Sequence, residues 1–279
     1  MEIGQQPTMQ SREIKKIEPS NFLKIKISPS NITLVLLKHL TGELIDYFSF
    51  SFEELIPEEK LSIKLRSIIK DCNINKSNII SVEVFFNNKL SCIIPETLFD
   101  EKHGLDYLKY NAKLLKNDIT SYDNIEEIDA VNVYLPYTNV NNFLIENYGA
   151  FNYYHYSTLF IKKILKLNTS SGKTNLYINF DINYFQISII KNNDLVYFNT
   201  FNFNSPEDAL YYILYNIKQN KINTSKSNTI FFGKIKPNDK YYKLFLKFIK
   251  NIKIQDFDIH KSKDLSTKKE DIDFLLTWE

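Results

Sequence analysis

The chain has 279 residues, of which 43% are hydrophobic and 24% charged, so it can bury a full core and is not a disordered protein. Its 35 basic and 33 acidic residues leave a net charge of +2, which gives no overall field that would attract nucleic acid. Cys72 and Cys92 are too few for a disulfide framework, and no stretch has the apolar length of a signal peptide or a membrane span. We therefore expect a cytoplasmic protein that does not insert into membranes.

The first half of the chain predicts a strand-rich unit after a polar leader at residues 1–20. Leu23–Ile27 alternates apolar and polar residues, as is typical of a strand, and a turn at Pro29–Asn31 follows. Acidic residues surround Pro57 and basic residues follow, which is the charge pattern of a helix that begins there. The other predicted strands are Ile32–Leu37, Leu44–Phe52 and Ile79–Phe86.

The second half repeats this order of elements. A helix is predicted from Ser205, where Ser-Pro-Glu-Asp supplies an N-cap, a first-turn proline and first-turn acids. Matching elements of the two halves are offset by about 150 residues, which predicts a duplicated β-β-β-α-β unit. The predicted strands of this copy are Leu176–Phe180, Phe185–Ile190, Leu195–Phe203 and Thr229–Phe232.

Material between the two copies has no counterpart in the second half. It includes an acidic loop at Asp123–Asp129. A helix that Ser157 would cap, running to about Leu167, ends this part of the chain. The remaining predictions are strands at Lys89–Ile94, Ala130–Leu135 and Phe151–Tyr156, and helices at Glu96–Asp100, Leu105–Lys116 and Val140–Tyr148.

These patterns divide the chain into a first domain with an inserted subdomain and a second domain. The second domain would end with a helix near Lys240–Ile249 and a strand near Ile252–Phe257. The hydrophilic run after it predicts a charged tail, with an apolar hook at Phe274–Trp278 as the alternative. The expected segments are a leader at 1–20, the first domain at 21–167, a linker at 168–174, the second domain at 175–259 and the tail at 260–279.

Three stretches, Phe85–Asp100, Leu105–Leu115 and Ala130–Phe143, resemble an uncharacterised bacterial family best known from Bacteroidetes. Together with the duplicated unit, they make the chain similar to proteins of the actin-like (ribonuclease H-like) ATPase fold. The uncharacterised bacterial family is itself similar in layout to the actin-like proteins of pilus assembly and type II secretion. The resemblance implies an α/β fold of two domains around a cleft, and it implies no activity.

The resemblance also implies where a nucleotide site would lie. In actin-like ATPases an Asp-x-Gly type turn in each hairpin approaches the phosphates, and a Gly-Gly turn makes room for adenosine. The first turn here is Ser28-Pro29-Ser30-Asn31, which has no glycine, and proline removes an amide donor. The second turn keeps Asp181 but has Asn183 at the glycine position, and the adenosine position, Gly233-Lys234, has one glycine of the pair. Ser28, Ser30, Asn31, Asp181, Asn183, Gly233 and Lys234 are therefore the candidate nucleotide-binding residues.

Other chemistry is sparse. Gly172-Lys173-Thr174 lacks the earlier glycine of a phosphate-binding loop, because Leu167 stands there, and it runs from a predicted helix into a strand. The four histidines lack neighbouring ligands, so no metal site is expected.

We expect a non-catalytic actin-like module that needs no cofactor and binds an unidentified protein partner. The alternatives are an actin-like ATPase or kinase that binds ATP and Mg²⁺ at an atypical site, and an RNA-associated scaffold.

Overall fold

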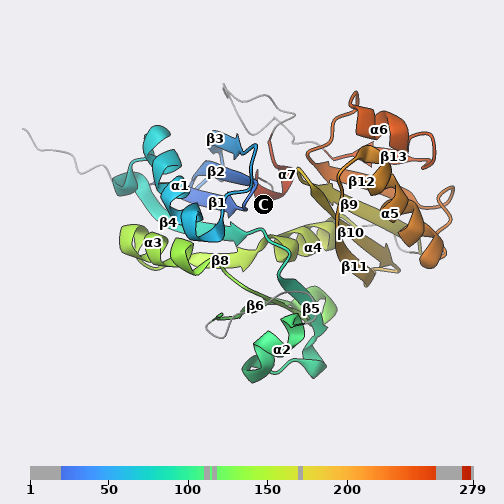
Figure 1. The fold of residues 1–279 in the computed structure, drawn as a ribbon, viewed down its shortest axis with the longest axis horizontal. Helices are drawn as coiled ribbons and strands as arrows, with labels where there is room; N and C mark the ends of the chain where they lie inside the picture. Colours follow the sequence, from blue (N-terminus) through green and yellow to red (C-terminus); the bar gives the residue numbers. More distant parts are fainter. Residues whose placement is uncertain (1–19, 110–113, 115–117, 169–171, 256–271, 278–279) are drawn as a thin grey trace, which may run out of the picture.

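Two five-stranded sheets form the centres of two domains in the computed structural model, which is described here for residues 20–109, 114, 118–168, 172–255 and 272–277 (Figure 1). The first sheet has the order β3-β2-β1-β4-β8 and the second β11-β10-β9-β12-β13. Their strands are Asn21–Ile27 (β1), Asn31–Lys38 (β2), Leu44–Ser51 (β3), Ile79–Phe86 (β4), Asn152–His155 (β8), Thr174–Phe180 (β9), Tyr184–Lys191 (β10), Asp194–Asn202 (β11), Asn228–Gly233 (β12) and Ile252–Ile254 (β13).

The two sheets repeat one another in detail as well as in order. In each, an antiparallel three-stranded meander is followed by a helix and by a strand parallel to the first. The ladder between β2 and β3 shifts register at Leu36/Leu37, and the ladder between β10 and β11 shifts at Ile189/Ile190, 153 residues later. Because a bulge sets local twist and is a specific feature of a ladder, this match supports the repeated β-β-β-α-β unit predicted from the sequence.

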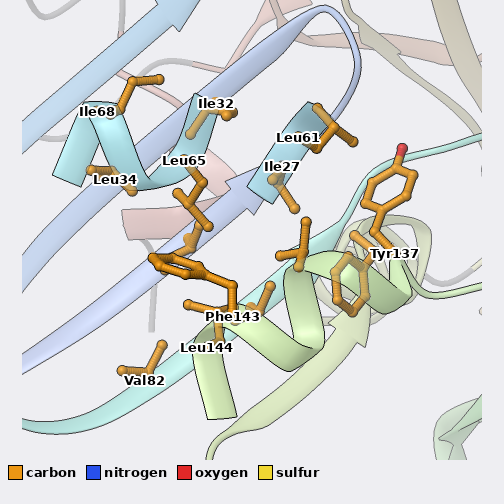
Figure 2. Packing of buried hydrophobic residues seen from close by; sticks show 14 of the residues in the cluster. Ile27, Ile32, Leu34, Leu61, Leu65, Ile68, Val82, Tyr137, Phe143 and Leu144 are labelled. Atoms are coloured by element: carbon orange, nitrogen blue, oxygen red, sulfur yellow. The ribbon is translucent and has the colours of Figure 1, made fainter. Parts of the chain in front are cut away.

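Helices cover the outer face of each sheet. Helices α1 (Glu58–Asp71) and α3 (Thr138–Tyr148) cover the first, and α5 (Pro206–Gln219) and α6 (Lys240–Phe245) cover the second. Figure 2 shows Leu61, Leu65 and Ile68 of α1 packed with Phe143 and Leu144 of α3 over the first sheet. None of the helices in the described residues is long and apolar enough to cross a membrane.

Between the inner faces of the two sheets lie helix α4 (Tyr156–Leu167) and the short helix α7 (Phe274–Thr277) (Figure 1). Side chains of both helices share one buried cluster with Val35 and Leu37 of the first sheet and Phe232 of the second. Leu275 and Leu276 of α7 are 1% and 0% exposed. Residues 272–277 are therefore folded between the domains, and the alternative of an apolar hook, which the sequence did not favour, describes them better than a charged tail. Residues 260–271 of the expected tail, like residues 1–19 of the leader, lie outside the described residues.

The insertion forms a three-stranded sheet of order β5-β7-β6 with the short helix α2 (Gly104–Leu108) (Figure 1). Its strands are Ser91–Pro95 (β5), Ser121–Ile125 (β6) and Ala130–Tyr134 (β7). The acidic loop predicted at Asp123–Asp129 is wrong in its first half, because Asp123 lies in β6 and is 7% exposed. The helix predicted at Leu105–Lys116 is described only to Leu108, since residues 110–113 and 115–117 lie outside the described part of the chain.

Asp123 joins the inserted sheet to helix α4. Its carboxylate accepts hydrogen bonds from the Tyr134 hydroxyl at 2.9 Å, the Thr158 hydroxyl at 2.6 Å and the His155 amide at 2.8 Å. A carboxylate at a helix N-terminus is stabilised by the helix dipole and by the free amides there. This role explains why Asp123 is buried in β6. Burial nevertheless raises the pKa of Asp123.

His155, and not Ser157, caps α4. Its Nδ1 accepts the Ser157 amide at 3.2 Å, so Nε2 carries the proton and donates to the Asn88 carbonyl at 3.2 Å. Complete burial lowers the pKa of His155 to about 3. The ring is therefore neutral in the folded protein, and protonation would remove the cap.

This cap predicts a pH dependence of stability. The pKa of His155 is lowered on folding, so its contribution is complete above the unfolded pKa of about 6.5 and is lost as the pH falls towards 3. Relative to His155→Asn, which keeps an oxygen acceptor for the Ser157 amide, the wild type should lose about 1.4 kcal/mol of unfolding free energy per pH unit between about pH 6 and 4. Urea unfolding at several pH values measures this. His103→Asn is the exposed control, and equal slopes for the wild type and His155→Asn would contradict the assignment.

Candidate functional site

A cleft with a volume of about 570 Å³ opens between the two domains. Strands β2 and β3 form one wall with side-chain amide and hydroxyl groups, including those of Asn31 and Ser49. The other wall comes from Phe180 at the end of β9 and from the loop after β12. The residues around the cleft are Lys26, Asn31, Thr33, Tyr47, Phe48, Ser49, Phe50, Ser51, Phe180, Gly233, Lys234, Lys236, Asp239, Ile272 and Asp273.

The first hairpin turn is buried and bonded to itself. The Ser28 amide donates to the Asn31 carbonyl at 2.9 Å, and the Asn31 amide donates to Ser28 Oγ at 3.0 Å. The Ser28 and Ser30 hydroxyls are 3.2 Å apart, and both residues are at most 3% exposed. The carbonyls of Pro29 and Ser30 accept amides from Ile56 and Phe52, so the segment after β3 covers the turn. Only Asn31 of these candidates lines the cleft.

The second hairpin turn has the same backbone bonds. The Asp181 amide donates to the Tyr184 carbonyl, and the Asn183 carbonyl accepts the Phe203 amide, as Ser30 accepts Phe52 in the first turn. Neither Ser30 nor Asn183 has a positive φ. The left-handed backbone that asparagine tolerates is therefore not used at Asn183, and the turn does not have the backbone that makes glycine necessary.

The two domains meet at a buried ion pair. The Lys26 ammonium, on the central strand β1, lies 3.5 Å from Asp181 Oδ2 in the second domain and 3.0 Å from Asp273 Oδ2 beside α7. It also lies 4.0 Å from the centre of the Tyr156 ring, in cation–π geometry. Asn87, which follows β4, donates its amide to the same Asp181 oxygen at 3.0 Å. One carboxylate of the second domain is thus held by two side chains of the first.

Asp273 is the anchor of the C-terminal segment. Its carboxylate oxygens accept the Tyr156 hydroxyl at 2.9 and 2.7 Å, and its amide donates to the Tyr47 hydroxyl at 2.9 Å. Oδ1 also accepts the Leu275 amide at 3.1 Å, which fixes the start of α7. Lys26 and Tyr156 therefore contact the carboxylate of Asp273, and the Tyr47 hydroxyl accepts its backbone amide.

The charges in this group stabilise one another. Burial alone would lower the pKa of Lys26, but Asp273 and Asp181 outweigh it and the pKa is raised. For Asp181, burial acts to raise the pKa, yet the charges of Lys26 and Lys234 and the Ile182 amide hold it below the usual value. Lysine and aspartate are therefore both charged near neutral pH, and each compensates the desolvation of the other.

Gly233 lies where the second domain's sheet turns into the cleft. Its φ is +80°, and an added Cβ would lie 2.1 Å from the Phe180 carbonyl oxygen. This close approach allows the Lys234 amide to donate to that carbonyl at 2.9 Å. Lys234 Nζ then crosses to the first domain and donates to Ser51 Oγ at 2.7 Å. Glycine is thus required here by the backbone itself.

The structure brings some of the candidate residues together and separates others. Asn31, Gly233 and Lys234 line the cleft and Asp181 lies at the buried ion pair, whereas Ser28 and Ser30 are enclosed within their turn. The sequence analysis missed Lys26, Asn87 and Asp273. No local pattern pointed to Lys26, because the alternation of Leu23–Ile27 predicts a strand but not that both of its faces are buried.

The family model described as "Protein of unknown function (DUF3822)" matches residues 10–252. The chain belongs to this family. Among solved structures, it is similar to a Bacteroides thetaiotaomicron protein with actin-like ATPase fold and unknown function. The identity is 20% over 85% of this chain and 91% of that one, with a TM-score of 0.72. No curated protein matches the sequence.

A second similar structure is the PilM-PilN type IV pilus biogenesis complex, with 9% identity over 86% of this chain and 88% of that one and a TM-score of 0.54. These likenesses confirm the actin-like fold and the family resemblance expected from the sequence. At such identities they carry the fold alone.

Removal of the buried ammonium should destabilise the whole fold. Lys26→Met removes the ammonium that lies between two carboxylates, and breaking a buried pair in this way costs about 3–5 kcal/mol. We expect that loss in urea unfolding at pH 7, with a smaller loss at lower pH, because the charge of Lys26 no longer holds the pKa of Asp181 down. Lys38→Met, in which the exposed ammonium 2.9 Å from Glu43 is lost, should cost about 1 kcal/mol or less. Equal effects of the two substitutions would contradict the central role of Lys26.

Gly233→Ala should be more costly than a glycine substitution at a similar φ in open space. Gly172 has a φ of +81° with nothing within 4 Å of an added Cβ, so Gly172→Ala measures the backbone penalty alone, about 1–2 kcal/mol. At Gly233 the clash with Phe180 adds to that penalty, and we expect a total above about 3 kcal/mol in thermal or urea unfolding. Similar costs at both sites would mean that the loop moves away easily.

Proposed function

We propose that this protein is a non-catalytic actin-like module for interaction or assembly, whose cleft is held together by an internal ion pair instead of a nucleotide. The observation that carries the proposal is the position of Lys26. Its ammonium lies between Asp181 and Asp273, beside the hairpin turn where an actin-like ATPase would bind phosphate and metal.

The residues present do not fit a magnesium nucleotide. Asp181 is the carboxylate that would position a metal, but its oxygens already accept Asn87, Tyr184 and the Ile182 amide, with Lys26 at 3.5 Å. A divalent cation there would have to displace the ammonium or bear its repulsion, which is strong where the dielectric is low. Lys26 therefore takes the electrostatic place of a bound cation.

The phosphate side of the site is equally unsuited. Phosphates bind to backbone amides that have no other acceptor. In the first turn, the Ser28 and Asn31 amides are bonded within the turn, Pro29 has none, and the segment after β3 covers the loop. The second turn uses the Asp181 amide for Tyr184 and the Ile182 amide for the Asp181 side chain.

The interaction role is supported by the kind of protein that shares the fold. The pilus structure is named as a complex of PilM with PilN, and it matches 86% of this chain. An actin-like protein without nucleotide chemistry would still offer two domains, a cleft and an inserted subdomain as binding surfaces.

A second candidate, an ATP-binding actin-like ATPase or kinase with an atypical site, is favoured by the cleft itself. A volume of about 570 Å³ lies within the range of small-molecule sites. Lys234, Lys236 and Asp239 line it beside the hydroxyls of β2 and β3. On this alternative, Asp181 would position the metal through water.

Calorimetric titration with Mg-ATP separates the two candidates. We expect no saturable heat up to about 1 mM nucleotide, because the amides of Ser28, Asn31, Asp181 and Ile182 and the Asp181 carboxylate are already bonded within the protein. Micromolar binding would overturn the proposal. Asp181→Ala should then abolish turnover, whereas Asp194→Ala, in the exposed first residue of β11, should leave turnover unchanged.

A further inference from the structure

The C-terminal segment between the domains has the character of a bound peptide. Ile272 is 8% exposed and Leu276 0%, and Phe274 packs against Phe232 with ring centres 6.1 Å apart. The segment contributes no strand to either five-stranded sheet. Its position depends on one acidic residue and the apolar side chains around it.

The groove that receives this segment is shared by both domains. Lys26, Tyr47 and Tyr156 bind the acidic residue, as described above, and all three belong to the first domain or to α4. The apolar part is a mixed surface, formed by Val35, Leu37 and Leu44 of the first sheet, Phe160 and Ile164 of α4, and Tyr177, Ile190 and Phe232 of the second sheet. A ligand seated here contacts both domains at once.

The segment also lies beyond the part of the chain that the family model matches. The family model ends at residue 252, whereas the buried ligand residues are 272–277. The groove is built from matched residues, and its occupant lies outside the match. The match to the family model therefore includes the residues of the groove and not those of its occupant.

We propose that this groove is a peptide-binding site for a segment of a partner protein in which an acidic residue is followed by three apolar residues, and that residues 272–277 are its tethered competitor. Charge complementarity assigns the acidic residue, since Lys26 is the cation at that end of the groove. The apolar residues follow from the buried side chains of Phe274, Leu275 and Leu276. The inference deepens the proposed interaction role and does not depend on the absence of nucleotide binding.

A free peptide has to compete with residues 272–277, which are attached to the same chain as the groove. A ligand that is part of the same chain has an effective concentration on the order of mM, so a free peptide binds poorly to the wild-type chain. A substitution that weakens the resident segment should open the site to a peptide in trans. The probe is a fluorescein-labelled peptide with the sequence of residues 270–279, Glu-Asp-Ile-Asp-Phe-Leu-Leu-Thr-Trp-Glu.

Fluorescence anisotropy with full-length chains tests the proposal. The labelled peptide should bind the Asp273→Ala chain at least tenfold more tightly than the wild-type chain. A peptide with alanine in place of its second aspartate, the equivalent of Asp273, should bind that variant at least tenfold more weakly. Adding Tyr156→Phe should reduce this preference for aspartate and leave the affinity for the alanine peptide unchanged, since the Tyr156 hydroxyl donates to that carboxylate.

Several results would overturn the proposal. Equal affinity for the wild-type and variant chains, or no binding to a variant that circular dichroism shows to be folded, would make the segment an ordinary part of the core. If Asp273→Ala does not fold, Asp273→Asn gives the same comparison with the side-chain shape retained. A concentration-dependent dimer that the peptide dissociates would identify a second copy as the occupant instead of a partner. ATP binding measured separately would overturn the non-catalytic role and leave these outcomes unaffected.

Discussion

A lysine ammonium that is buried between two domains has to be neutralised by whatever surrounds it. Lys26 is 6% exposed, and transfer of such a charge out of water costs several kcal/mol unless partners are close. Its partners come from the second domain and from the C-terminal segment, at 3.5 and 3.0 Å. The first domain therefore reaches its stable state only with the other two pieces in place. Domain arrangement and the position of residues 272–277 follow from this one requirement.

Comparison of the two copies of the repeated unit shows how the buried ion pair arises, because the copies differ at the positions of Lys26 and Asp181. The register places Lys26 opposite Phe85 and Asn179 opposite Phe232, so Lys26 and Asn179 hold equivalent positions in the two sheets. The same offset of 153 residues places Ser28 and Asp181 at equivalent positions in the two hairpin turns. The two copies share a backbone, but only one carries the lysine and only the other carries the aspartate. The repeated β-β-β-α-β backbone is the frame of both domains. The contact of Lys26 with Asp181 and Asp273, called the clasp below, results from side chains that differ between the two copies.

The frame could be predicted from local patterns and the clasp could not. Alternation, turn residues and the Ser205-Pro206 cap belong to neighbouring residues, and the copies reinforce each other through a constant offset. The buried role of Lys26 depends on residues 155 and 247 positions away. The alternation of apolar and polar residues in Leu23–Ile27 is equally typical of a strand with one solvent-exposed face. Asp123 was missed for the same reason, since its helix-capping contacts with His155 and Thr158 join separate elements.

The position of the clasp changes what can control the cleft. In a protein whose domains close on a ligand, the ligand supplies the free energy of closure and its concentration sets the closed population. Here Lys26, Asp181 and Asp273 are all parts of the chain, so the contacts that join the two domains at this point come from the protein itself. A molecule can open the cleft only by replacing one of these groups with better contacts of its own. Asp273 is the group whose replacement costs least rearrangement, because it lies on a terminal segment and Asp181 lies in a sheet hairpin. The proposed competitor for the C-terminal segment would therefore act on this cleft by displacing Asp273 from Lys26.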